Sequence, residues 1–510
     1  MSWIRKVADA IAPGWIARRD VARLRGELAR QQWDHLVRLS TYEAAARSRE
    51  TGDWNPRTVS ADQAIIPDAP TLNARARQAA RDDWAAASII RGDVRHIVGK
   101  GITALANARD ISTGLPLTHF NNTINRLWRR WTTNPKWCDI ERRKTFLAMQ
   151  HLMIREYKTV GEGFAILNYT PRPDMVGLTI QIIEIEQLAC DLSRNPETGY
   201  EIRHGIELDP HGAAAAYWIY TQGHPLDTYA GKPERIDADR VLHHMRQDRP
   251  RQSHGVTHLA PVLKKLRNLL MYDEYTVLRA RAEACTGASI ETDLGAGPAS
   301  VLGLQPGDGE SATDERGNQE FVFEPGMVWD LGPGKRAQFH APQTPGGNYE
   351  PFTLRQLKDA AAGAGSDYPT VSRDYSGNTY SGQRQGLLEM WMETDPEQDF
   401  LTSNFCQPVH DSFVTFAALE GRVSAPGWWN LDQRAALLDA DWQPQAKDWI
   451  DPANRAKAEE TKLKLRVTTR RKIANELGET VEENFQQLED ENDMATRHNI
   501  ALPENGGTTQ

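Results

Sequence analysis

Histidine pairs and isolated cysteines are the first places in this chain where chemistry is conceivable. His254 and His258 stand four residues apart, a spacing that can present two metal ligands on one helical face. A Gly-Val-Thr run separates them, so there is no glutamate base between them, and no third ligand is evident. We therefore interpret them as polar residues around a helix start. Cys285 ends a predicted helix with no evident base to activate it as a nucleophile.

Phosphate-binding and acidic patterns are also incomplete. Residues 332–336 read Gly-Pro-Gly-Lys-Arg, which lacks the first glycine and the final hydroxyl residue of a P-loop, so we interpret them as a β-turn. The acidic pairs Asp237/Asp239 and Asp439/Asp441 resemble divalent-ion ligands, but such pairs are typical of turns and helix caps. The sequence thus predicts no catalytic site, no metal and no cofactor. It favours a structural or conduit role over an enzyme.

Composition limits the function further. The chain has 510 residues, 39% hydrophobic and 25% charged, which is typical of an ordered protein large enough for two or more cores. A formal net charge of −9 excludes a globally basic nucleic-acid binder but leaves room for a local basic face. The four cysteines are far apart, which predicts a reducing interior. No run of 18 apolar residues and no signal-peptide core occur, so we expect a soluble protein without membrane association.

The longest element that the sequence predicts is a helix from Gln383 to Glu420. Its apolar residues recur every four positions, at Leu401, Phe405, Val409 and Phe413, which is the spacing of one helical face. At 1.5 Å per residue such a helix is roughly 50 Å long, more than most single domains need. A polar loop rich in hydroxyl groups and tyrosine precedes it. A flexible loop followed by a long helix indicates a mechanical component of an assembly, in which the helix positions the loop.

Two prolines lie within this helix, Pro396 and Pro408. Each removes a backbone hydrogen bond and displaces the preceding turn, so we expect the helix to bend near one or both of them.

Upstream, the pattern predicts an α+β region. Residues 1–40 read as a helix with a basic face, followed by an extended arm to residue 70. A single helix is predicted over Arg75–Val98, with Trp84 on its buried side, and further helices over 121–131 and 142–160. Predicted strands follow, over 164–169, 178–184, 200–208, 215–220 and 236–244.

Downstream, two helical segments enclose an insertion. A helix is predicted from Val256 or Leu259 to about Cys285, with basic residues on one side. Residues 287–352 are rich in Gly and Pro with short strands, and the helical pattern resumes after them. Helices are predicted over 452–465 and 467–477, followed by an acidic tail with a disordered end.

Taken in order, several motifs resemble the lambda-type portal family of tailed phages over roughly residues 40–455. Each motif is weak alone, and their shared order carries the resemblance. The motifs are Leu72-Asn73-Ala74-Arg75-Ala76-Arg77, Gly161-Glu162-Gly163-Phe164, Ile183-Glu184-Ile185-Glu186, Phe323-Glu324-Pro325-Gly326 and, as the best match, Ala361-Ala362-Gly363-Ala364-Gly365 with Asp374-Tyr375-Ser376, Tyr380-Ser381 and Leu387-Leu388-Glu389.

The resemblance implies an α+β portal-type subunit. It would have an α/β wing, two stem helices flanking a small β-containing clip, a long kinked spine helix and a helical C-terminal crown. The implied ranges are an N-terminal helix and arm at 1–70, wing at 71–252, stem at 253–286, clip at 287–352, second stem helix at 353–367, tunnel loop at 368–383, spine at 384–420, return to the wing at 421–465, and crown helix with a disordered acidic tail at 466–510.

The same resemblance implies the biology. Portals are rings, usually of twelve subunits, at one capsid vertex of the virion, and assemble in the host cytoplasm. The implied partners are further copies of the chain, double-stranded DNA, the terminase large subunit, a head-tail adaptor protein and the major capsid protein. The ring would dock the packaging motor, then the connector, and pass DNA out at ejection.

The resemblance also assigns residues. The tunnel loop would carry Tyr368, Arg373, Asp374, Tyr375, Asn378, Tyr380, Ser381 and Arg384. Of these, we expect Arg373, Tyr375, Asn378 and Tyr380 to touch the duplex transiently. The basic stem residues Lys264, Lys265 and Arg267 would face the channel or a neighbouring subunit, and salt bridges between subunits are an equal alternative.

Two rival functions remain open at this point. One is another structural head or baseplate component, and the other is a nuclease or ATPase of the packaging apparatus. The missing P-loop argues against the ATPase.

Overall fold

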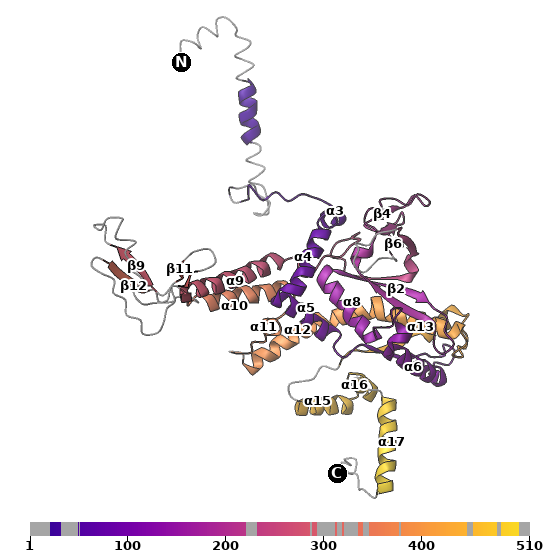
Figure 1. Cartoon of the computed structure of the whole chain (residues 1–510). Coiled ribbons are helices and arrows are strands. Elements are labelled where there is room, and N and C mark those ends of the chain that lie inside the picture. The colour runs from indigo at the N-terminus through magenta and orange to yellow at the C-terminus, as the bar shows by residue number, and fades with distance from the viewer. Residues whose placement is uncertain are drawn as a thin grey trace. The chain divides into compact units, whose positions relative to one another are not determined.

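The computed structural model describes residues 21–31, 49, 51–220, 232–285, 288–292, 312–313, 319–320, 335–339, 346–376, 379–445, 452–476 and 481–498 (Figure 1). The chain divides into two compact units, Met1–Ser60 and Ala61–Gln510. In the first unit, residues 21–31 form a helix whose side chains are all exposed. The rest of the predicted basic helix lies outside the described residues. No described helix is long and apolar enough to cross a bilayer.

The second unit opens with α3 (Ala61–Ile65), α4 (Ala69–Asp82) and α5 (Trp84–Ile97). The prediction of one helix over Arg75–Val98 is wrong, because the chain breaks at Asp83. The Asp83 carboxylate accepts hydrogen bonds from the backbone N–H groups of Ala85 (2.8 Å) and Ala86 (3.1 Å), so it caps α5. The break also turns Trp84 outward: its side chain is 46% exposed, against the prediction of burial.

The largest core joins helices from distant parts of the chain to a three-stranded antiparallel sheet. The helices are α6 (Thr118–Thr133), α7 (Pro135–Cys138), α8 (Phe146–Val160), α13 (Gln407–Leu419) and α14 (Leu431–Leu438). The sheet has the order β3 (Leu178–Ile183), β2 (Glu162–Tyr169), β8 (Val241–Met245). Trp128 and Trp131 pack on Phe413 at 5.1 and 5.3 Å between ring centroids. The predicted apolar stripe of the long helix is confirmed, because all four of its residues are fully buried.

A second, four-stranded antiparallel sheet has the order β4 (Glu201–Arg203), β5 (Ile206–Leu208), β6 (Ala214–Ile219), β7 (Glu234–Asp237). The predicted strand over 236–244 is therefore wrong: β7 pairs with β6, β8 pairs with β2, and a 3-10 helix (Ala238–Arg240) lies between them. A further 3-10 helix spans Ile185–Gln187, and β1 (Thr103–Ala106) pairs with β13 (Ala440–Gln443).

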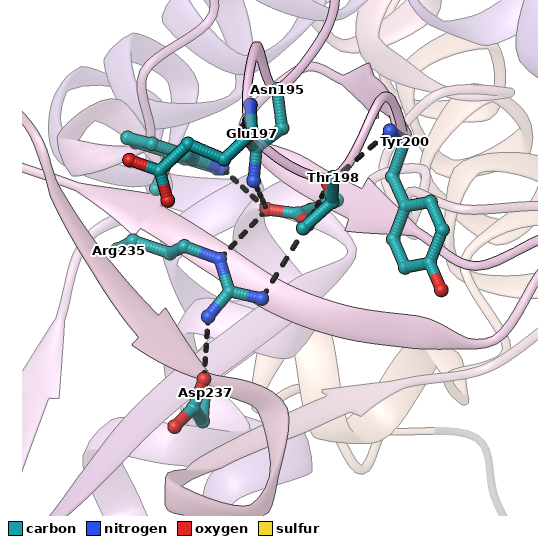
Figure 2. A network of polar contacts seen from close by, with 8 residues as sticks. Asn195, Glu197, Thr198, Tyr200, Arg235 and Asp237 are labelled. Carbon is teal, nitrogen blue, oxygen red and sulfur yellow. Dashed lines mark hydrogen bonds and ion pairs between the residues drawn. The ribbon is translucent and has the colours of Figure 1, made fainter.

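A buried carboxylate ties the turn at residues 195–199 to this sheet (Figure 2). Glu207 accepts hydrogen bonds from Asn195 Nδ2, Thr198 Oγ1, Trp218 Nε1 and Arg235 Nε, each at 3.0 Å. Arg235 also pairs with Asp237 at 2.6 Å. With every lone pair engaged, the acidic group stabilises the turn and is not available as a ligand site.

Two helices, α9 (Leu263–Cys285) and α10 (Tyr349–Gly363), pack antiparallel (Figure 1). The first begins later than predicted because Pro261 lacks an N–H group and disfavours helical backbone at the residue before it. In the predicted clip, β9 (Ala288–Thr292) pairs with β12 (Lys335–Phe339), and β10 (Ala312–Thr313) with β11 (Gln319–Glu320). The Gly-Pro-Gly turn at 332–334 lies outside the described residues.

After α11 (Tyr368–Ser372), the predicted long helix is present as α12 (Tyr380–Leu401), a π-helical turn (Thr402–Cys406) and α13. Pro396 lies inside α12 and Pro408 in the first turn of α13. π-helical turns and prolines are both places where helices change direction. The bend near the prolines stays a prediction.

The C-terminal region contains α15 (Pro452–Lys464), α16 (Arg470–Glu476) and α17 (Val481–His498). The predicted acidic tail contains a helix over residues 481–498, which the sequence analysis did not predict. Their net acidity obscured an apolar spacing in which Phe485, Leu488 and Ala495 share a helical side. The predicted disordered end, Pro503–Gln510, lies outside the described residues.

Candidate functional site

The predicted loop is held in place by α5. The Ser88 hydroxyl donates a hydrogen bond to the carbonyl oxygen of Val371 at 2.7 Å, and both Thr370 and Val371 are buried against α5. Gly92 leaves room for this contact, because a Cβ atom there would lie 2.7 Å from Thr370 Cγ2. The segment that begins the loop is therefore docked on a helix some 280 residues earlier in the chain.

The other end of α5 is joined to α12. The Gln398 side-chain amide donates hydrogen bonds to the carbonyl oxygens of Ile97 (2.9 Å) and His96 (3.2 Å), which satisfies the C-terminal carbonyl groups of α5. Close by, Glu397 forms an ion pair with Lys158 of α8 at 3.4 Å. Helix α5, which holds the start of the loop, and helix α12, which follows the loop, are thus hydrogen-bonded to each other.

The loop itself is shorter than predicted. Residues 368–372 form α11 and residue 380 begins α12, so the described residues between the two helices are 373–376 and 379. Arg373 adopts a left-handed backbone (φ 61°) and its N–H group bonds to Pro369 O at 2.9 Å, which ends α11. The Thr379 hydroxyl accepts a hydrogen bond from Gly382 N at 3.2 Å and so caps α12.

Asp374 is bonded within the loop. Its carboxylate accepts hydrogen bonds from the Tyr368 hydroxyl (3.0 Å) and from Ser376 N (2.9 Å). The bonds from Ser376, and then the bond from Tyr368, lower the pKa of Asp374 below its usual value. Asp374 and Tyr368 therefore shape the loop from inside.

Two loop residues project outward. Arg373 is exposed and the Tyr375 side chain is 54% exposed. At the start of α12, Ser381 and Arg384 are exposed as well. Asn378 lies outside the described residues, and for Tyr380 only the backbone position at the start of α12 is described.

The helix that holds the start of the loop, α5, also carries two arginines that the sequence analysis did not single out. Arg91 and Arg95 are both exposed. Burial and then the charge of Arg373 lower the pKa of Arg95 below its usual value. The signal in the sequence was their spacing of four residues on one helix, but nothing there linked α5 to a loop so far along the chain.

The three basic stem residues do not behave alike. Lys265 of α9 pairs with Asp359 of α10 at 2.7 Å, and Arg355 binds the same carboxylate at 3.0 Å. The sequence analysis expected Lys265 to face the channel or a neighbouring subunit, and it did not predict this pairing within the chain. Lys264 and Arg267 are exposed, and their contact with the channel or a neighbouring subunit stays a prediction.

Of the two histidines considered as metal ligands, His254 is hydrogen-bonded within the fold. His254 and His258 both precede α9, and His254 Nδ1 lies 3.1 Å from the buried Glu162 carboxylate, which His243 Nε2 also contacts at 2.8 Å. Within the described part of the chain, no cluster of His, Cys, Asp and Glu is arranged to hold a metal ion.

Comparison with known proteins assigns the family. The family model described as "Phage portal protein, lambda family" matches residues 47–398. The chain belongs to this family of phage portal proteins. The match includes α5, α9–α11 and most of α12, and therefore the whole loop.

Curated relatives are portal proteins too. The chain is 24% identical over 462 residues to the probable portal protein of Halomonas phage phiHAP-1, covering 88% of this chain and 86% of that protein. It is 22% identical over 456 residues to portal protein B of Escherichia phage lambda, covering 85% of each. A chain in the virion of a native gene transfer agent particle aligns with a TM-score of 0.40 at 12% identity, covering 84% of this chain and 94% of that one.

The Ser88 hydrogen bond provides a test of how this portal-family loop is anchored. Replacing Ser88 by alanine is expected to lower the free energy of unfolding by about 1 kcal/mol and to speed amide exchange selectively at residues 370–373, because a buried carbonyl group loses its donor. Hydrogen-exchange mass spectrometry measures both effects. Equal protection of these amides in variant and wild type would contradict the anchoring role.

Proposed function

We propose that copies of this chain assemble into a ring that forms the DNA channel at one capsid vertex of a tailed phage. Portal rings usually have twelve subunits. The wing comprises residues 71–252 with the return at 421–465, and α9 and α10 form the stem that flanks the clip. The ring docks the terminase large subunit during packaging and the head-tail adaptor afterwards, and it contacts the major capsid protein. DNA leaves through the same channel at ejection.

The observation that supports this proposal most is the loop at 373–379. The Asp374 carboxylate is hydrogen-bonded to Tyr368 near the start of the loop. Ser88 of α5 binds the segment that begins the loop, and Thr379 at its end caps α12. Such a loop presents Arg373 and Tyr375 in a fixed frame while leaving both side chains accessible. A rigid support with a few exposed contacts is what a moving duplex requires.

The charge balance supports a channel of this kind. Binding through many phosphate contacts is strong and steeply salt-dependent, and it would stall a translocating duplex. The chain carries a formal net charge of −9 and presents few cations at the loop, so each subunit would repel the duplex weakly and touch it briefly.

Alanine at both Arg373 and Tyr375 is expected to reduce the amount of packaged DNA and its retention, because the loop then lacks its projecting groups. The measurement is nuclease-protected DNA per particle. Arg81→Ala serves as the matched control, since Arg81 is an exposed arginine of α4 already paired with Asp82 at 3.0 Å. Unchanged packaging and retention in the double variant would refute a DNA contact at the loop.

Negative-stain microscopy of the purified protein tests the assembly separately. A ring with a central channel is the expected result. Sheets or monomers would favour a different structural role in the particle, and ATP hydrolysis by the purified chain would favour a packaging enzyme.

A further inference from the structure

Positive charge is concentrated on α6, α7 and the turn that follows them. Residues 126–144 include seven lysines and arginines against two carboxylates, in a chain whose formal net charge is −9. The guanidinium groups of Arg130 in α6 and Arg172 between β2 and β3 lie 5.9 and 5.7 Å from the centroid of the Trp137 ring. Arg172 also donates a hydrogen bond to the carbonyl oxygen of Lys136. These contacts bring cations from separate segments of the chain to one place.

The turn after α7 adds two more arginines. The buried Asp139 carboxylate accepts a hydrogen bond from the backbone N–H group of Arg143 at 2.9 Å. Cys138 Sγ donates to the carbonyl oxygen of Lys144 at 3.3 Å, so the turn folds back onto α7. Arg142, which has a left-handed backbone (φ 60°), and Arg143 are both exposed. Buried groups therefore fix the turn, and it presents both arginines to solvent.

The cations of this region are not used within the fold. In the part of the chain that the structure describes, none of Arg130, Arg142 and Arg172 forms an ion pair, whereas the nearby Lys144 pairs with two carboxylates. Apolar side chains lie among them, because Trp137 is half-buried and Ile140 is 40% exposed. The basic surface, as we define it, consists of four arginines and these two apolar residues: Arg130, Arg142, Arg143, Arg172, Trp137 and Ile140.

The C-terminal helix α17 has the opposite charge and an uncovered apolar side. Phe485 and Leu488 lie on the same helical side as the buried Ala495, yet they are 54% and 52% exposed. The element on which α17 packs most is α16. Four carboxylates of α17 are exposed and form no ion pair with a described residue: Glu489, Asp490, Glu491 and Asp493. This helix therefore offers both the negative charge and the apolar groups that the basic surface lacks.

We propose that α17 of one copy binds the basic surface of a neighbouring copy, with its carboxylates on the arginines and its apolar side over Trp137 and Ile140. This inference rests on the proposed ring. Each subunit supplies one acidic helix and one basic surface, and a contact between two different surfaces of identical subunits is the kind that closes a ring. A second copy fits better than duplex DNA, because the phosphate backbone offers charge but nothing apolar to cover Trp137 and Ile140.

Charge reversal in the full-length protein tests this contact. The surface variant is Arg130→Glu/Arg142→Glu, and the helix variant is Glu489→Lys/Asp493→Lys. All four positions are exposed, and circular dichroism first verifies that each variant is folded. Mass photometry then measures the fraction of subunits that form rings as a function of protein concentration.

Each variant alone is expected to assemble poorly, because like charges then face each other across the contact. The concentration at half assembly should rise by about tenfold or more. Mixing equal amounts of the two variants should restore the rings, because every contact then joins opposite charges when the two chains alternate around a ring with an even number of subunits. The control Arg75→Glu/Lys457→Glu reverses two exposed cations of α4 and α15 and should assemble as the wild type does.

Other outcomes overturn the contact and separate it from the ring itself. If mixing restores nothing but one chain carrying all four changes assembles, α17 binds its own copy and not a neighbour. If the surface variant assembles normally but binds a fluorescent DNA duplex more weakly than the wild type, the basic surface serves DNA. Rings formed equally well by every variant would refute the contact and leave the proposed ring standing. A wild type that forms no ring would overturn both proposals.

Discussion

Replacing Glu162 by glutamine is expected to lower the free energy of unfolding by about 3–5 kcal/mol, because it removes one partner of a buried charged pair. The Glu162 side chain is 1% exposed and receives hydrogen bonds from His254 Nδ1 and His243 Nε2. His254 Nε2 faces the carbonyl oxygen of Arg203 at 3.2 Å. Both partners of His254 are acceptors, so both of its ring nitrogens must donate and the ring is an imidazolium.

Glutamine cannot satisfy this arrangement. Its carbonyl oxygen can accept from one histidine, but its NH2 group then faces an N–H group of the other. One donor is left unpaired in a buried site, and the positive charge on His254 loses its counter-ion. The network joins β2, β8 and the segment before α9, so the three-stranded sheet is expected to loosen from the segment that leads into α9.

The pH dependence of this variant follows from the two pKa shifts. Burial opposes ionisation of Glu162, but the two histidines outweigh it and lower its pKa from 4.5 to about 2, so its contribution is present above pH 4.5 and is lost as the pH falls towards 2. Burial likewise opposes protonation of His254, but Glu162 raises its pKa above 6.5, so its contribution is present below pH 6.5 and is lost at higher pH. The wild type should exceed the variant in stability most between pH 4.5 and 6.5.

Chemical denaturation of the purified full-length protein at several pH values measures this effect. Glu201→Gln is the matched control, because Glu201 is 58% exposed and pairs with Arg203 at the surface of the neighbouring sheet. It should cost less than about 1 kcal/mol. A Glu162→Gln variant as stable as the control, or a difference that does not vary with pH, would rule out the charged network.

The elements that the sequence predicted well are those with a strong local pattern. The stripe from Leu401 to Phe413 repeats every four residues, and each of its members is buried against Trp128, Phe146 or their neighbours. The strands over 164–169, 178–184 and 215–220 were predicted for the same reason, since apolar and β-branched residues cluster between turn residues.

The parts that the sequence missed depend on contacts between distant residues. Asp83 reads as one more polar residue in a helical pattern, and only its bonds to Ala85 and Ala86 reveal a break. Asp374 reads as a loop residue open to solvent, although Tyr368 and Ser376 occupy its carboxylate. Ser88 and Gly92 read as ordinary small residues of a helix, and only their contacts with Val371 and Thr370 reveal that α5 anchors the start of the loop.

Contacts between distant residues also determine which glycines can be replaced without loss of stability, and Gly255 is an example. Gly255 reads as a turn residue before a helix, but it faces Gly161 across a gap with no room for a side chain. A Cβ atom at Gly255 would overlap the carbonyl oxygen of Gly161, and one at Gly161 would overlap the backbone of Val256. Gly161 also adopts a left-handed backbone (φ 93°) at the end of α8.

Replacing Gly255 by alanine is therefore expected to destabilise the protein by about 1–3 kcal/mol from overpacking alone. Backbone atoms line both sides of the gap, so no side-chain rotation can relieve the overlap, and the segment before α9 must move away from the turn between α8 and β2. That movement carries His254 away from Glu162. The total loss should approach that of Glu162→Gln.

The control is Gly386→Ala in α12, where a new Cβ atom meets no atom within 4 Å and alanine gains up to about 1 kcal/mol in helix propensity. Thermal or denaturant unfolding should therefore show that Gly255→Ala lowers the free energy of unfolding, whereas Gly386→Ala raises it, although both replace glycine by alanine. The combined variant Gly255→Ala/Glu162→Gln decides the mechanism. Because both changes break the same contact, its loss should fall short of the sum of the single losses, and a fully additive result would mean that the glycine gap and the charged network act independently.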